Sequence, residues 1–353
     1  MKKQPRVLIL SKGSRENPAS RYRHYNMLPY LERAGFKVDI FPLFEDVYYK
    51  SILLEKDAKK RILRKSLYSM KRFIKRISHI PFLGHYDLVV IENQLFPYEQ
   101  GFLEWIATRI NGKLVIEFDD AIFLTKLHSG KLARTLKLAE HVIVGNPNLA
   151  EFARRYNDSV SVIPTVFDLR HYDKLPEREP KARPAIGWLG QPVGLQYLKV
   201  VAPALQELAK THDFELRILS RESVEIPGVD VHLVPWNLEH EKQDLVQLDV
   251  GIMPLFDDIW SRHKCAGKLL HYMALGIASL ASPVGVNTDI IKDGVNGFLA
   301  ADTKQWTDKL ARLLDDETLR LKMGKAGRLT AKEYSLQVWA PKVAELYRHL
   351  IEK

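Results

Sequence analysis

The sequence predicts an α/β protein with two parallel β-sheets, one in each half of the chain. Short apolar runs of four or five residues alternate with longer stretches in which apolar residues recur every three or four positions. The alternation stops at residues 168–184, a charged and proline-containing stretch, and then resumes. The length of 353 residues is sufficient for two domains that each bury a core of their own.

The first half contains six strand-like runs, at residues 6–10, 37–41, 88–91, 114–118, 141–144 and 160–163. Helical periodicity occupies residues 21–34, 99–110 and 149–156, and Gly35 ends the first of these helices. Strands that alternate with helices form parallel sheets covered by helices on both faces. The second half repeats the pattern, with strands expected at residues 185–189, 215–219, 231–234, 250–253 and 277–280, and helices at 197–211, 239–248 and 266–275.

Composition indicates a soluble globular protein, with 46% hydrophobic and 27% charged residues. No apolar run reaches the roughly 18 to 20 residues that a membrane span needs, and the start MKKQPRVLIL has too short an apolar part for a signal peptide. We therefore expect a cytoplasmic location.

The single cysteine, Cys265, excludes an internal disulfide and fits a reducing compartment. Catalytic use of its thiol stays an alternative, since neighbouring lysines at a helix N-terminus lower a thiol pKa.

The net charge of +10 is concentrated in one segment. Between Glu55 and Arg76, ten Lys and Arg residues stand against two acids. Five apolar residues of this segment recur at helical spacing, namely Leu63, Leu67, Met70, Ile74 and Ile77. The pattern predicts an amphipathic helix that either packs its apolar stripe on its own domain or lies on an anionic membrane through residues 55–77. Nucleic acid is a third possible partner that we do not expect, because interleaved stacking aromatics are missing.

Residues 261–299 combine cations with glycine turns. Arg262, Lys264 and Lys268 stand before and within the first turns of the helix expected at 266–275, where unpaired backbone N–H groups favour an anion. A diphosphate is the natural ligand for such a place. Three glycines downstream, Gly285, Gly294 and Gly297, supply turns that bring the backbone close to a ligand or another element.

The same stretch resembles a known family. The runs HYMALG at 271–276, PVGVN at 283–287 and DGVNGFL at 293–299 are similar to the donor-binding half of the family 4 (group 1) retaining glycosyltransferases. The family typically has two glutamates eight residues apart, and His263 and His271 take their places here. These histidines either replace the donor contacts of the glutamates or are ordinary polar residues flanking a helix. A subgroup that lacks the paired glutamates is closer to this chain.

The resemblance implies a GT-B type fold, in which two Rossmann-like domains with parallel sheets face each other across a cleft. It places an acceptor-binding domain at 1–167, a linker at 168–184, a nucleotide-sugar donor-binding domain at 185–335, and at 336–353 a C-terminal helix that returns to the first domain. The implied reaction moves a sugar from a nucleotide diphosphate sugar to an acceptor hydroxyl with retention, without metal or cofactor. We expect a glycan or lipid-linked acceptor in bacterial surface glycan synthesis, whether of polysaccharide, lipopolysaccharide or glycolipid. The alternative is a non-catalytic nucleotide-sugar-binding or partner subunit with a degenerate site.

In the implied donor site, Lys264 and Lys268 stabilise the departing diphosphate. Gln191 follows the glycine after which relatives commonly carry basic residues, so these lysines take a larger role here. Trp236 either frames the nucleotide base or packs in the core. The expected donor-binding residues are Gly190, Gln191, Trp236, Arg262, His263, Cys265, Ala266, Gly267 and His271.

The first half offers three candidate segments. Arg21 and Arg23 end a polar loop after the first strand. They either bind donor phosphate or an anionic acceptor, or are ordinary surface residues.

Asp119 and Asp120 follow the strand at 114–118, where adjacent carboxylates are costly unless solvated, paired or used. By the resemblance, Asp119 stands where many relatives have a histidine, so one of the two orients the acceptor hydroxyl or receives its proton. Paired acids are also typical of metal sites, but the implied fold stabilises the leaving group with cations. Asn146 either lines the acceptor side or caps the next helix.

Overall fold

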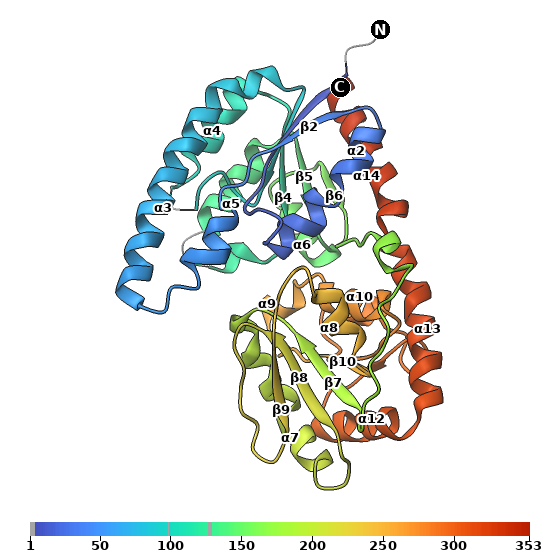
Figure 1. Cartoon of the computed structure of the whole chain (residues 1–353). Coiled ribbons are helices and arrows are strands. Elements are labelled where there is room, and N and C mark those ends of the chain that lie inside the picture. The colour runs from blue at the N-terminus through green and yellow to red at the C-terminus, as the bar shows by residue number, and fades with distance from the viewer. Residues whose placement is uncertain (1–3, 98, 126–128) are drawn as a thin grey trace. The chain divides into compact units, whose positions relative to one another are not determined.

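The computed structural model describes residues 4–97, 99–125 and 129–353, which form two compact units (Figure 1). The first unit comprises Met1–Val166 together with Leu336–Lys353, and the second comprises Phe167–Ser335. Each unit is built on a six-stranded sheet in which every strand pair is parallel. The predicted α/β class is therefore confirmed.

The sheet of the first unit has the strand order β2-β1-β3-β4-β5-β6. Its strands are β1 (Arg6–Leu10), β2 (Lys37–Ile40), β3 (Leu88–Glu92), β4 (Leu114–Phe118), β5 (His141–Val144) and β6 (Val160–Val162). The three strands β3, β4 and β5 are buried along their whole length. This explains why they read as continuous apolar runs, since helices cover both faces of a parallel sheet.

The helices of the first unit are α1 (Pro18–Ser20), α2 (Leu28–Arg33), α3 (Ala58–His79), α4 (Phe102–Ile110), α5 (Ser129–Leu138), α6 (Pro147–Ala153) and α14 (Leu336–Glu352). Shorter turns are η1 (Arg21–Tyr25), η2 (Tyr48–Ile52), η3 (Ile80–His85) and η4 (Ile122–Leu124). The apolar side of α14, which includes Val343 and Leu350, packs in the core of this unit with Val7 and Ile9 of β1.

The single helix expected at residues 21–34 is replaced by two short pieces, η1 and α2, and α1 precedes them. The turn η1 is π-helical, and α2 begins beside Pro29. Proline lacks the N–H that would continue an earlier helix, so the hydrogen-bond ladder is interrupted here. The wider π turn directs Arg21, Arg23 and His24 into the interior, where all three are buried.

The sheet of the second unit has the order β12-β11-β10-β7-β8-β9. Its strands are β7 (Ala185–Leu189), β8 (Glu215–Ser220), β9 (Val231–Pro235), β10 (Val250–Met253), β11 (Ala278–Ala281) and β12 (Phe298–Leu299). The helical elements are η5 (Leu169–Tyr172), η6 (Pro192–Tyr197), α7 (Leu198–Leu208), α8 (Glu241–Val246), α9 (Ile259–Arg262), α10 (Gly267–Ala274), α11 (Asn287–Ile290), α12 (Thr303–Asp315) and α13 (Glu317–Glu333). The buried residues of α7, α12 and the central strands form one core.

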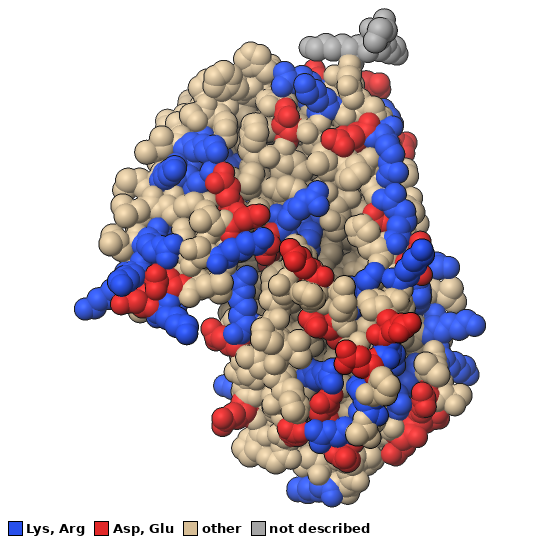
Figure 2. All heavy atoms as spheres, in the orientation of Figure 1, with Lys and Arg blue, Asp and Glu red and all other residues tan. Residues whose placement is uncertain are grey.

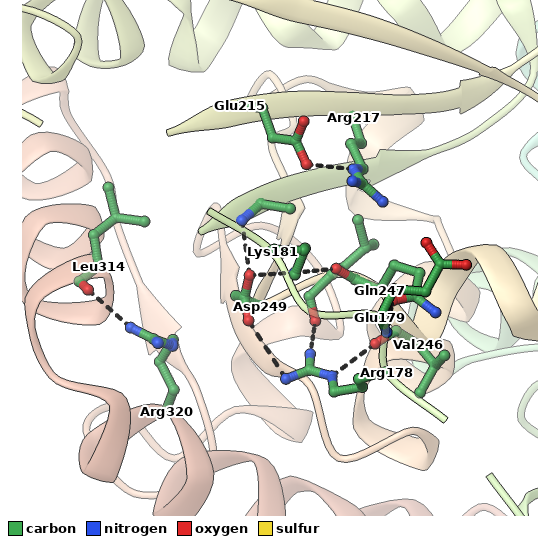
Figure 3. A network of polar contacts seen from close by, with 12 residues as sticks. Arg178, Glu179, Lys181, Glu215, Arg217, Val246, Gln247, Asp249, Leu314 and Arg320 are labelled. Atoms are coloured by element: carbon green, nitrogen blue, oxygen red, sulfur yellow. Dashed lines mark hydrogen bonds and ion pairs between the residues drawn. The ribbon is translucent and has the colours of Figure 1, made fainter. Parts of the chain in front are cut away.

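Residues 168–184, the stretch expected as a linker, are attached to the second unit by a polar network (Figure 3). Arg178 donates to the carbonyl of Val246 at 2.8 Å, and Lys181 Nζ lies 2.6 Å from Asp249 Oδ2. The same carboxylate oxygen accepts from the backbone N–H of Ala185 at 2.7 Å. Asp249, placed just before β10, thus joins the incoming chain to the first strand of this sheet.

The basic segment forms α3, a 22-residue helix whose N-terminus is capped by Asp57. The carboxylate of Asp57 accepts from the backbone N–H of Lys60 at 2.9 Å. The apolar stripe that starts at Leu63 is exposed to solvent, so the interpretation that it packs on its own domain is wrong. Among the helices over the described residues, none combines the length and the apolarity needed to span a bilayer.

Candidate functional site

In the second unit, the candidate site is built at the N-terminus of α10. Ala266, the residue before the helix, is buried and has a left-handed backbone with φ 51°. Such a conformation costs an alanine about 1 to 3 kcal/mol and is concentrated at functional sites. Gly267 and Lys268 follow in the first turn, where backbone N–H groups are not used by the helix. The local backbone therefore has the geometry of an anion-binding helix start.

The ammonium of Lys268 lies over the ring of Trp188, 4.2 Å from its centroid. It also lies against the end of β7, since a Cβ added at Gly190 would be 2.8 Å from Lys268 Nζ. Burial, with a smaller contribution from the positive charge of Lys264, lowers the pKa of Lys268 to about 7. The structure thus brings together three predicted residues, Gly190, Lys264 and Lys268. An anion bound here would relieve the repulsion between the two lysines.

Lys264 lies over a second aromatic ring, with its Nζ 5.3 Å from the centroid of Tyr197. Tyr197 ends η6, the turn that follows Gln191, and the side chain of Gln191 is exposed. Lys268 therefore contacts an aromatic side chain of β7 itself, and Lys264 contacts one from the turn that follows β7. A cation over an aromatic face gains about 0.5 to 2 kcal/mol, which helps to hold the two ammonium groups near each other.

Arg262 and His263 make local contacts around α9. The guanidinium of Arg262 pairs with Asp257 through contacts of 2.6 Å and 3.0 Å, and both side chains are exposed. The Nδ1 atom of His263 is 2.6 Å from the carbonyl oxygen of Ile259. Gly285 approaches the Arg262 backbone with φ 56°, and a Cβ there would lie 2.6 Å from the Arg262 carbonyl oxygen. Only glycine fits this turn, which joins two predicted segments.

His271 lies within α10 and is buried, so the interpretation of it as an ordinary polar residue flanking a helix is wrong. Its Nε2 atom is 3.0 Å from the hydroxyl of Tyr172 and 3.8 Å from Glu241 Oε1. The other oxygen of Glu241 accepts from the indole N–H of Trp236 at 2.6 Å. A carboxylate therefore stands beside His271, although the sequence has no glutamate at that position.

Sequence reasoning missed Glu241 and Tyr172. Glu241 lies in a polar stretch at the start of α8, and Tyr172 lies in the stretch taken as a linker. Nothing in their spacing relates them to His271. Trp236, which is half-buried, is a partner of Glu241 and not simply a core residue. Cys265 is half-buried next to the strained Ala266.

In the first unit, two buried acids lie at the carboxyl ends of neighbouring strands: Glu92 is the last residue of β3, and Glu117 is the last but one of β4. Glu92 accepts from the backbone N–H of Lys12 at 2.9 Å and from the hydroxyl of Ser20 at 2.7 Å. The Nε atom of Arg23 lies 2.5 Å from Glu117 Oε1. Neither acid was among the predicted site residues, although an acid at or near the end of an otherwise apolar strand is a readable signal.

His24, also missed, lies between the two acids. Its Nε2 atom is 3.5 Å from Glu92 and its Nδ1 atom is 3.5 Å from Glu117. Because η1 carries both His24 and Arg23, this one turn faces the ends of β3 and β4. The loop that follows β1 is thereby fixed by buried polar contacts at the carboxyl edge of the sheet, where ligands bind in open α/β sheets.

The interpretation of Arg21 and Arg23 as surface residues is wrong, because both are buried. Arg21 donates to the carbonyl of Arg15 at 3.0 Å, and Arg23 donates to the carbonyl of Ile163 at 3.1 Å. Both guanidinium groups therefore shape the loop after β1. Asn146 caps α6, since its side-chain oxygen accepts from the backbone N–H of Leu149 at 2.9 Å, so the capping interpretation is correct.

Asp119 and Asp120 follow β4 as partly exposed residues. Burial, followed by the charges of Asp120 and Glu92, raises the pKa of Asp119 to about 7, against the lowering effect of Arg23. With this pKa the Asp119 carboxyl is ionised in about half of the molecules at pH 7, and its ionised form is able to accept the proton of an acceptor hydroxyl. In the described residues, no group of three or more His, Cys, Asp and Glu side chains is placed to hold a metal ion.

An open groove of about 470 Å³ lies beside the loop that follows β1. It is lined by Ser14, Arg15, Tyr25, Pro42, Glu45, Asp46 and Val47. Acidic, basic and hydroxyl groups lie together along its walls. Such a lining suits a ligand with many hydroxyl groups, because each wall group can exchange hydrogen bonds with it.

Comparison with known proteins gives the second unit a family. A family model described as "Glycosyl transferases group 1" matches residues 183–316. The second unit carries a group 1 glycosyltransferase domain. This group 1 domain includes Lys264, Lys268, His271 and Glu241, whereas Tyr172 lies before the matched residues. No curated protein matches the chain.

Solved structures with similar folds extend over almost the whole chain. A glycosyltransferase from Rickettsia africae ESF-5 has a TM-score of 0.73 and 14% identity, covering 99% of this chain and 100% of its own. HepE from Anabaena, solved in complex with UDP and glucose, has a TM-score of 0.63 and 13% identity, covering 98% and 99%. The lipopolysaccharide outer core galactosyltransferase WaaB has a TM-score of 0.62 and 14% identity, covering 97% and 99%. The chain thus has the GT-B fold that carries the group 1 domain.

Proposed function

We propose that this protein is a retaining, metal-independent glycosyltransferase that moves a sugar from a nucleotide diphosphate sugar to an acceptor hydroxyl. The observation that carries the proposal is the position of Lys268, packed on Trp188 and Gly190 at the start of α10 within the group 1 domain. The proposed donor site is completed by Lys264 and the strained backbone at Ala266.

The chemistry follows from the charges that develop during transfer. As the bond from the anomeric carbon to the diphosphate oxygen breaks, negative charge grows on the leaving diphosphate and the sugar becomes oxocarbenium-like. Lys264 and Lys268, fixed against aromatic rings, stabilise that charge without reorganising. On the acceptor side, Asp119 takes the proton of the attacking hydroxyl or orients it, and its raised pKa fits either role.

UDP is the first nucleotide to test, because the similar fold of HepE was solved with UDP and glucose. We further propose an acceptor in bacterial surface glycan synthesis, in line with the structural likeness to the galactosyltransferase WaaB. The proposed location is the cytoplasm, with contact to the inner face of the membrane. The groove at Ser14, Arg15 and Asp46 is the proposed place for the acceptor.

Donor binding and turnover test the proposal in two steps. Thermal-shift measurements with UDP, GDP and ADP, and with their sugars, identify the nucleotide because ligand binding to the native state raises the melting temperature. Hydrolysis or transfer is then measured with the sugar of that nucleotide. Lys268→Ala is expected to lower turnover by about 100-fold or more, while Lys332→Ala, an exposed lysine on α13, leaves it unchanged. Normal turnover of Lys268→Ala would remove this lysine from the site.

The product decides the stereochemical part of the proposal. NMR of the transferred sugar gives its anomeric configuration, and inversion would contradict the retaining mechanism. A second candidate function is a non-catalytic nucleotide-sugar binder, favoured by the histidines at positions 263 and 271 and by the ion pair that engages Arg262. A thermal shift with a nucleotide sugar, in the absence of any hydrolysis or transfer, would support this second function.

A further inference from the structure

The long helix α3 presents its apolar residues to solvent. Six of them are between 39% and 65% exposed, namely Ile62, Leu63, Leu67, Met70, Ile74 and Ile77. From Leu63 onward they recur every three or four residues, and with Ile62 they form one continuous stripe along the helix. Phe82, in the turn that follows α3, is 59% exposed as well. Contiguous exposed apolar surface of this kind marks an interaction site.

The opposite side of α3 is attached to the first unit by polar groups. Arg72 donates to the carbonyl of Leu43 at 2.8 Å, and Arg76 donates to the carbonyl of Ser11 at 2.8 Å. The hydroxyl of Tyr68 accepts from the backbone N–H of Glu45 at 2.9 Å. Arg72 and Arg76 are buried in these contacts. The helix is therefore held in an orientation that directs its apolar stripe outward.

Helix α3 also carries seven exposed cations. They are Lys59, Lys60, Arg61, Arg64, Lys65, Lys71 and Lys75. Figure 2 shows Lys and Arg side chains, with Asp and Glu side chains among them, at the left edge of the molecule where α3 begins. Helical spacing places Lys60, Arg64, Lys71 and Lys75 along one border of the stripe. An apolar face bordered by cations is the arrangement of helices that lie in a membrane interface.

A groove of about 500 Å³ runs along the other border of the stripe. It is lined by Ile62, Lys65, Ser66, Ser69, Met70, Phe73 and Phe96. The rings of Phe73 and Phe96 are 4.4 Å apart and form part of its wall. The apolar surface thus continues from the helix into a recess, which extends the area that an apolar partner can cover.

We propose that α3 binds the surface of a bilayer that contains anionic lipid, with its apolar stripe inserted among the acyl chains and its cations at the headgroups. Charge complementarity selects this occupant. A second copy of the chain would bring two strongly basic helices together, and like charges repel. A nucleic acid would pair with the cations but would leave the apolar stripe in water.

Vesicle co-sedimentation of the full chain tests this proposal without any sugar nucleotide, so its outcome is independent of the proposed enzymatic function. We expect binding to vesicles of phosphatidylcholine and phosphatidylglycerol, and weak or absent binding to phosphatidylcholine alone. The triple variant Leu63→Gln/Leu67→Gln/Ile74→Gln is expected to bind at least about tenfold more weakly. Its matched control is Leu321→Gln/Leu329→Gln on α13, where the two leucines are 60% and 59% exposed.

The cations are tested separately. Lys59→Gln/Lys60→Gln/Lys71→Gln is expected to weaken binding about fivefold per lysine, or about 1 kcal/mol each. The matched control, Lys322→Gln/Lys325→Gln/Lys332→Gln on α13, changes the net charge equally without touching α3. Far-UV circular dichroism confirms that each variant is folded, as expected for substitutions at exposed positions.

Three outcomes would overturn the proposal. The first is equal binding to vesicles with and without anionic lipid, or equal binding of the stripe variant and the wild type. The second is a dimer in sedimentation velocity that the stripe variant abolishes, because the occupant would then be a second copy. The third is binding to a random oligonucleotide that is tighter than binding to anionic vesicles and insensitive to the stripe variant.

Discussion

Lys268 provides a quantitative test of the proposed donor site, because its pKa of about 7 lies far below the usual value for a lysine. Near neutrality, about half of the unliganded molecules carry a neutral Lys268. A diphosphate bound beside the ammonium favours the charged form and raises this pKa. Binding of UDP should therefore take up a proton, and the uptake should follow the neutral fraction of Lys268 in the unliganded protein.

The expected magnitude follows from the two protonation states. With a pKa of about 7 before binding and a value well above 9 after it, uptake is about 0.5 proton per UDP at pH 7 and about 0.9 at pH 8. The affinity should fall by about fivefold between pH 7 and pH 8 and by nearly tenfold between pH 8 and pH 9. The last proton of the diphosphate itself dissociates near pH 6, so measurements above about pH 7.5 isolate the lysine.

Isothermal titration calorimetry in buffers of different ionisation enthalpy measures the proton uptake directly. Lys268→Arg is the decisive variant, because a guanidinium keeps its charge throughout this pH range. The variant should bind UDP without proton uptake and with an affinity that is independent of pH. Lys332→Arg on α13 is the control and should retain the uptake of the wild type. Absence of uptake at pH 8 in the wild type, or undiminished uptake in Lys268→Arg, would refute the assignment.

Three further predictions concern the two units separately. Gly190→Ala places a Cβ 2.4 Å from the Trp188 ring and 2.8 Å from Lys268 Nζ. It should lower the free energy of unfolding by about 1 to 3 kcal/mol and weaken UDP binding. The Cβ of the control Gly112→Ala meets nothing within 4 Å, so this variant should change neither quantity. Asp119→Asn should stabilise the fold by about 1 to 3 kcal/mol above pH 7. The native pKa of about 7 exceeds the unfolded value, so the wild type loses stability as pH rises from about 4 to 7, and the variant does not. Parallel pH profiles of the two proteins in urea unfolding would contradict this. Glu241→Ala removes the carboxylate that accepts from Trp236 and faces His271, and should lower the free energy of unfolding by about 1 to 2 kcal/mol. Glu241→Gln should lower it less. Equal urea midpoints for the wild type and both variants would count against a stabilising role of these contacts.

The sheets could be predicted because the strands of a parallel sheet are buried on both faces and read as continuous apolar runs. Leu88–Glu92 and Leu114–Phe118 are of this kind, and both were found from sequence. The two-residue strand β12 was not found, since its pairing with β11 is decided by tertiary contact. The break of the helix expected at residues 21–34 followed from Pro29 and from the burial of Arg21 and Arg23, which helical periodicity does not reveal.

The candidate site was predictable only where its residues are close in sequence. Lys264, Ala266 and Lys268 fall in one short stretch, and the rule that helix starts attract anions identifies them. Glu241 stands 30 positions before His271, and Glu92 and Glu117 reach His24 from two separate strands. Such groupings depend on how the sheet orders its strands, which sequence spacing alone does not specify. The raised pKa of Asp119 likewise depends partly on Glu92, a residue of a different strand.

Helix α3 shows why periodicity identifies an amphipathic helix without saying which face is buried. A guanidinium can be buried when carbonyl groups accept its hydrogen bonds, as Leu43 and Ser11 do for Arg72 and Arg76. Burying the apolar stripe would have stabilised the unit by about 1.5 kcal/mol or more for each large side chain. The first unit instead leaves Leu63, Ile74 and their neighbours in water and forgoes that free energy. In the proposed membrane-bound state, the acyl chains of the bilayer would form the apolar phase in which the stripe regains that free energy.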